Sequence, residues 1–226
     1  MVTSEELNAT FEKVGNDFHF DEVTAEFAPY RDLKVRWCRM MRHADFSVSD
    51  YLEGAPSEVV EGIARTIFSR IRGEEPENYP KETIEWLTSP EFLELNQEKY
   101  IERSRTIGEM SSEEAGMLWE SYYRLVDAGL IPEIDGLRLF WSKNDSVAKA
   151  GQSSCLMRVV IMNRRFLNDK VPTEALDFCL LHELANIVIG FGIGNLERKK
   201  MVNEMSDGYA GADVAKKWLD QVMMEV

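Results

Sequence analysis

The stretch from Val171 to Gly192, VPTEALDFCLLHELANIVIGFG, decides how the rest of the chain is interpreted. Pro172 and Glu174 suit the start of a helix, and Gly190 suits its C-terminal end. Between them apolar side chains cover nearly the whole circumference, which is typical of a helix that is buried on all sides. These side chains belong to Leu176, Phe178, Cys179, Leu180, Leu181, Leu184, Ala185, Ile187, Val188 and Ile189. The sequence therefore predicts a central helix with other elements packed around it.

Two ionisable residues, His182 and Glu183, lie in the middle of this apolar helix. They open the segment HELAN, which matches the pattern H-E-x-x-H except that Asn186 replaces the second histidine. In that pattern residues four apart share one helix face, so two imidazoles bind a metal ion while the glutamate acts on metal-bound water. An unpaired buried charge costs on the order of several kcal/mol, so both side chains need partners. The pair is therefore either part of a reactive site or a buried hydrogen-bonded pair of the core.

The chain has 226 residues, and its 26 basic against 40 acidic residues give a net charge of −14. An acidic surface argues against binding to nucleic acid or to anionic membranes, because both depend on basic surfaces. The chain contains no apolar run of about 20 residues, and its acidic start does not resemble a signal peptide. Three widely spaced cysteines, Cys38, Cys155 and Cys179, fit free thiols in a reducing compartment. We therefore expect a cytoplasmic protein.

The apolar patterns divide the chain into three segments and predict an α+β fold. Residues 1–73 predict a short helix, two strands and a second helix, and residues 74–132 predict helices throughout. Residues 133–226 predict strands, the central helix and two shorter helices. The strands are expected at 33–38, 46–49, 137–141, 153–156 and 158–163.

Residues 1–73 and 133–226 resemble each other, which indicates a possible internal duplication of a strand-strand-helix unit. Pro56 aligns with Pro172 without a gap, and Trp37 and Trp141 are both expected in the opening strand of their unit. The alternative is that any two Pro-started amphipathic helices would align as well. The aligned positions include Glu58 with Glu174, Glu61 with Asp177, and Ile63 with Cys179.

Strands, a buried HELxx helix, a Gly-rich break and a further helix together resemble the SprT-like zinc metallopeptidases. The chain is more narrowly similar to uncharacterised SprT-like proteins that carry a VSDYL…AP…EGLART-type segment near the N-terminus. Here that segment reads Val48-Ser49-Asp50-Tyr51-Leu52, then Ala55-Pro56, then Glu61-Gly62-Ile63-Ala64-Arg65-Thr66. The resemblance implies a zincin-like fold in which the strands pack on the HExxH-type helix.

The resemblance also implies zinc held by three protein ligands. Carried over by position, His182 is the first ligand, Glu183 is the general base, and Asn186 occupies the position of the second ligand. The third ligand falls near 195–199, where Glu197 is the available residue. A neutral amide is a poor replacement for imidazole on zinc, so these would be vestigial positions.

Three functions remain open on the sequence alone. The first is a degenerate, inactive metallopeptidase homologue with no cofactor, whose old cleft binds a peptide or protein. The second is an active metallopeptidase with an atypical zinc site built from His182 with Glu197 or Cys179. The third is an α+β protein-interaction module without metal.

Overall fold

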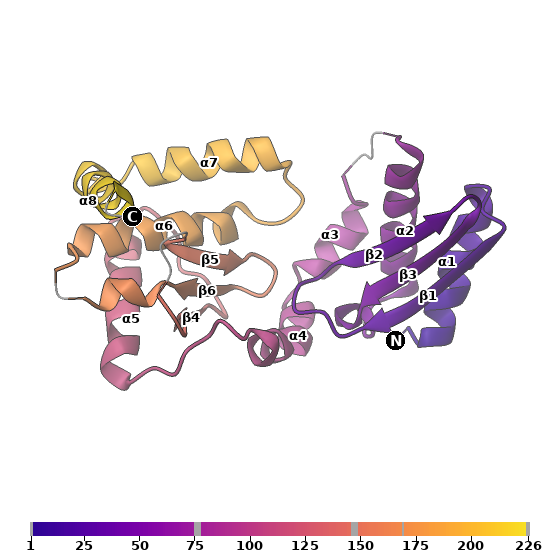
Figure 1. Cartoon of the computed structure of the whole chain (residues 1–226), viewed down its shortest axis with the longest axis horizontal. Helices are drawn as coiled ribbons and strands as arrows, with labels where there is room; N and C mark the ends of the chain where they lie inside the picture. Colours follow the sequence, from indigo (N-terminus) through magenta and orange to yellow (C-terminus); the bar gives the residue numbers. More distant parts are fainter. Residues whose placement is uncertain (1, 75–77, 146–148, 169, 225–226) are drawn as a thin grey trace. The chain divides into compact units, whose positions relative to one another are not determined.

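The computed structural model describes residues 2–74, 78–145, 149–168 and 170–224. The chain forms two compact units, residues 1–103 and 104–226. Each unit has its own three-stranded sheet and helices, which agrees with the predicted α+β class (Figure 1). The helices of the middle segment 74–132 divide between the units. Within the described residues no helix has the length and apolar character needed to cross a membrane.

The first unit begins with α1 (Ser4–Asp17), followed by β1 (Glu22–Ala28), β2 (Val35–Met40) and β3 (His43–Ser49). A 3-10 turn, η1 (Asp50–Leu52), leads into α2 (Ser57–Arg72), and then α3 (Lys81–Leu87) and α4 (Pro90–Arg103) complete the unit. The strands lie in the order β1-β3-β2, with β1 parallel and β2 antiparallel to β3. Helices α1 and α2 lie on the same side of this sheet. There the ring of Phe46 packs between those of Phe11 and Phe68, and its centroid is 5.0 Å from each of theirs.

The second unit begins with α5 (Ser112–Asp127), followed by β4 (Arg138–Trp141), β5 (Gly151–Ser154) and β6 (Val159–Met162). The 3-10 turn η2 (Arg164–Leu167) leads into α6 (Thr173–Ile189), and α7 (Asn195–Asp207) and α8 (Ala212–Met224) follow. The strands lie in the order β4-β6-β5, with β4 parallel and β5 antiparallel to β6. The two sheets thus have the same strand order and the same pairing directions.

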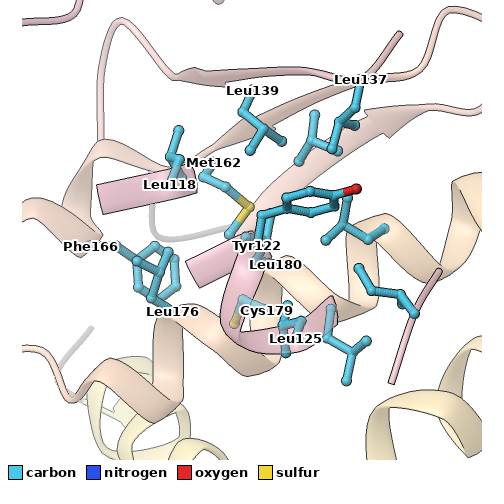
Figure 2. Packing of buried hydrophobic residues seen from close by; sticks show 14 of the residues in the cluster. Leu118, Tyr122, Leu125, Leu137, Leu139, Met162, Phe166, Leu176, Cys179 and Leu180 are labelled. Carbon is cyan, nitrogen blue, oxygen red and sulfur yellow. The ribbon is translucent and has the colours of Figure 1, made fainter. Parts of the chain in front are cut away.

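Helix α6 is the central element of the second unit, as its apolar sequence predicts. It packs against α5, α7, α8, β5 and β6, and Figure 1 shows it between the sheet and α7. Pro172 is its N-cap, and Gly190 ends it with φ of 85°, a backbone angle that favours glycine. Figure 2 shows the core in which side chains of α5, the sheet and α6 meet. This core includes Leu118, Tyr122, Leu125, Leu139, Met162, Leu176, Cys179 and Leu180.

Several sequence expectations differ from the structure. The strand expected at 153–156 lies two residues earlier, as β5. The first sheet has a strand, β1, that was not predicted, so Trp37 lies in the second strand of its unit and not in the opening strand. Trp37 is 49% exposed on β2, whereas Trp141 is fully buried on β4, so the proposed pairing of these tryptophans was wrong.

Candidate functional site

Helix α6 directs His182 and Glu183 toward different neighbours. Both side chains are half-buried, while Leu181 and Leu184 on either side of them are fully buried. Consecutive residues of a helix are separated by about 100° around the axis, so the two side chains diverge. Glu183 contacts β5, and His182 contacts α7.

The carboxylate of Glu183 is held by the neighbouring strand. Ser153 Oγ donates a hydrogen bond of 2.6 Å to Glu183 Oε2. Burial raises the pKa of Glu183, and the Ser153 hydrogen bond and the charges of His182 and Lys149 offset part of this rise. Strand β5 passes very close here: a Cβ atom added to Gly151 would lie 3.0 Å from Glu183 Cγ. A glycine at 151 therefore allows β5 to approach the helix at this point.

The imidazole of His182 faces Ser206 of α7, with Ser206 Oγ 3.4 Å from His182 Nδ1. Ser206 Oγ also donates to the Val202 carbonyl at 2.9 Å. A hydroxyl has only one hydrogen to donate. When Ser206 donates it to the Val202 carbonyl, Ser206 Oγ can only accept from His182, and the imidazole then carries its hydrogen on Nδ1. In that tautomer Nε2 of His182 carries the lone pair that could bind a metal ion.

Asn186 is occupied in the helix itself. Its Nδ2 donates to the His182 carbonyl at 3.0 Å, so the amide points back along α6. The backbone carbonyl of Asn186 accepts from Arg198 Nη1 at 3.2 Å, and Arg198 Nη2 donates to the Gly190 carbonyl. Arg198 therefore caps the C-terminal carbonyls of α6, which no residue of the helix can satisfy. The sequence analysis did not identify this role for Arg198.

The remaining candidate ligands do not join His182. Glu197 lies in the first turn of α7 with its side chain exposed. Cys179 is buried, and burial together with the nearby Glu183 raises the pKa of its thiol to about 12. Its side chain packs in the hydrophobic core of the second unit. The other two histidines, His19 and His43, belong to the first unit.

The donors around His182 do not fit the three-ligand zinc site that the resemblance implies. In the described part of the chain no three His, Cys, Asp or Glu side chains are grouped so that they could hold a metal ion. The arrangement can instead provide hydrogen bonds: Ser153 binds Glu183, Ser206 contacts His182, and the amide of Asn186 binds the helix backbone.

A second, more polar constellation lies in the same unit on Asp177, which is 4% exposed. Its carboxylate accepts hydrogen bonds from Ser121 Oγ at 2.5 Å and from Tyr209 at 3.2 Å. Arg124 forms a bidentate ion pair with the same carboxylate, with Nη2 2.7 Å from Oδ1 and Nε 3.0 Å from Oδ2. This network joins α5, α6 and the segment after α7, and it is fully paired, so its role is structural.

Comparison with protein-family models, with curated proteins and with solved structures found no match to this chain.

Proposed function

We propose that the chain is a degenerate SprT-like zinc metallopeptidase homologue that no longer hydrolyses peptides. The observation that carries the proposal is the position of His182 and Glu183 on a central helix between a sheet and α7, with Asn186 turned onto the helix backbone. A zinc-bound water has a pKa near 7, against about 16 for bulk water. Without the zinc ligands Glu183 has no such water to deprotonate.

In this proposal the old cleft binds an extended peptide or protein segment along a sheet edge. Strand β5 is the edge strand that packs on α6, and it supplies Ser153 next to Glu183. The acidic chain disfavours nucleic acid and anionic membranes as partners. The three free cysteines support a cytoplasmic location, which is part of the proposal.

We also propose that the two units arose by internal duplication of one helix-sheet-helix unit. The shared strand order supports this, as does the fact that Pro56 and Pro172 are each the N-cap of the helix after the sheet. Each preceding helix starts with a capping box, at Thr3 in α1 and Ser111 in α5, although the two caps are three residues out of register with the buried residues that follow. Each of these helices buries residues with the same spacing: Leu7, Phe11 and Val14 in α1, and Leu118, Tyr122 and Leu125 in α5.

An equivalent ion pair supports the duplication independently. The alignment of Pro56 with Pro172 places Glu61 opposite Asp177, and the buried triplets of α1 and α5 place Lys13 opposite Arg124. Lys13 Nζ lies 3.2 Å from Glu61 Oε2, and Arg124 Nη2 lies 2.7 Å from Asp177 Oδ1. Each pair joins the helix before a sheet to the helix after it.

A second candidate is an α+β interaction module in which His182 and Glu183 are only a core pair. The polar contacts to Ser206 and Ser153 favour it, because they give both half-buried side chains a partner without any metal.

The degenerate metallopeptidase and the interaction module predict different results when histidine ligands for zinc are introduced. In a zincin-like site, Asn186→His places a second imidazole one helical turn from His182, and Asn186→His with Glu197→His also offers a third. We expect zinc affinity, measured by competition with a chromophoric chelator, to rise by orders of magnitude in the double variant. Glu204→His, at an exposed position of α7, is the control and should leave affinity unchanged. If the double variant binds no better than the control, the site does not have zincin geometry.

A further inference from the structure

A pocket of about 300 Å³ lies in the second unit, on the other side of the sheet from Glu183. Successive residues of a strand face opposite sides of a sheet. On β5, Ser153 faces α6 and donates a hydrogen bond to Glu183. Its neighbour Gln152 faces the pocket, where Gln152 Nε2 donates a hydrogen bond of 2.8 Å to Thr106 Oγ1. The pocket adjoins the site of the proposed function, because Gly151 and Lys149 line the pocket and also lie near Glu183. Its role does not depend on that proposal.

The pocket is placed where the parallel strands β4 and β6 end. Ser142 follows β4 directly, Asn163 follows β6 directly, and both line the pocket. Hydrogen bonds fix these walls: Ser142 Oγ donates to the Asn144 carbonyl at 2.6 Å, and Asn163 Nδ2 donates to the Lys149 carbonyl at 2.7 Å. Ile161 adds an apolar surface to an otherwise polar lining.

Three cationic side chains, Arg105, Lys143 and Lys149, line this pocket together with one carboxylate, that of Asp145. In the described ranges none of the three cations is held in a salt bridge, whereas Arg124, Arg164 and Lys216 of the same unit each pair with a carboxylate. The excess of two positive charges is notable in a chain with a net charge of −14. Long-range electrostatics repel anions from such a chain, so anion binding needs a local cluster of this kind.

We infer that this pocket binds the phosphate group of a small molecule. Its excess of two positive charges matches a phosphate dianion, and lysine and arginine form charge-assisted hydrogen bonds to phosphate oxygens. The hydroxyl group of Thr106 and the amide of Gln152 add neutral polar contacts. The volume lies at the lower end of the range for small-molecule sites, so the organic part of the ligand is small and rests on Ile161.

The test is a titration of the ¹⁵N-labelled full chain with inorganic phosphate at constant ionic strength, followed by amide chemical shifts. We expect saturable shifts of Thr106, Gly151 and Gln152. Lys143→Gln with Lys149→Gln should weaken phosphate binding about tenfold or more, which corresponds to about 1.4 kcal/mol. Lys199→Gln with Lys200→Gln removes the same charge from exposed positions of α7 and should leave the affinity unchanged.

Three outcomes would overturn the assignment. Shifts that do not saturate, or an equal loss of affinity in both double variants, would mean that phosphate is attracted only by diffuse charge. Acetate binding as tightly as phosphate in a parallel titration would assign the pocket to carboxylates instead. An unchanged melting temperature confirms that each variant is folded, since all four lysines are exposed.

Discussion

Ser153 Oγ on β5 donates a 2.6 Å hydrogen bond to Glu183 Oε2 on α6. The bond links the edge strand of the second sheet to the central helix at the point where Gly151 allows the two to approach. It also holds Glu183 half-buried, where an ionised carboxylate is costly.

Glu183→Gln should stabilise the protein at pH 7. Burial raises the pKa of Glu183, so protonation of this group favours the folded state. Below the unfolded-state pKa of about 4.3 this protonation stabilises the folded state fully. The stabilisation is lost as the pH rises through the pKa of Glu183 in the folded state, which is higher. At pH 7 the charged Glu183 therefore costs stability, whereas Gln stays neutral and can still accept from Ser153.

We expect the free energy of unfolding of Glu183→Gln to exceed that of the natural chain at pH 7, with the gain vanishing near pH 4. Urea unfolding at both pH values measures this. Glu197→Gln, at an exposed position, is the matched control. A destabilised Glu183→Gln at pH 7 would show that the ionised carboxylate stabilises the fold.

Asp177→Ala should be among the most damaging single substitutions. It removes the shared acceptor of Ser121, Arg124 and Tyr209. Breaking a buried ion pair typically costs about 3–5 kcal/mol, and we expect the lower end because the Arg124 side chain is 43% exposed.

The equivalent substitution in the first unit, Glu61→Ala, is the comparison. The Glu61 side chain is 31% exposed and its partners Lys13 and Arg65 are exposed by 65% and 44%, so the loss should stay below about 1 kcal/mol. Urea unfolding of both variants measures the difference. Equal losses would contradict the view that burial makes the second pair the stronger structural link.

Leu180→Ala should destabilise the second unit by about 2–5 kcal/mol, because Leu180 is fully buried in the core around α6. Leu196→Ala removes the same atoms from a side chain that is 88% exposed and should change stability little. Thermal unfolding separates the two. A small effect at Leu180 would mean that α6 is not the packed centre of its unit.

The cysteines should react in a fixed order with a thiol reagent. Cys38 is exposed on β2, whereas burial raises the pKa of both Cys155 and Cys179, the latter to about 12. Because the thiolate is the reactive form, Cys38 should be modified first and Cys179 only on unfolding. Mass spectrometry of partly labelled protein measures the order. Labelling of Cys179 at the rate of Cys38 in the native protein would contradict the burial of α6.

The helices were largely predictable because their periodicity and punctuation are local. Helix α6 was expected from 172 to 190 and spans Thr173–Ile189, with Pro172 as its N-cap. Strand β1 was missed although Val23, Ala25 and Phe27 alternate with polar residues, because Glu and Ala are weak strand formers. Its pairing with β3 is parallel and depends on tertiary packing.

The partners of the candidate site could not be predicted, because they come from distant parts of the chain. Ser153 lies 30 residues before Glu183, and Ser206 lies 24 residues after His182. Neither serine has a recognisable motif around it. Likewise, the capping role of Arg198 depends on how α7 folds back onto α6.

The zinc content of the purified full chain tests the central claim most directly. The chain is incubated with excess zinc and dialysed, and bound metal is measured by mass spectrometry together with casein cleavage. We predict far less than one zinc per chain and no cleavage that a chelator abolishes. One tightly held zinc per chain that is lost in His182→Ala, with chelator-sensitive cleavage, would contradict the account.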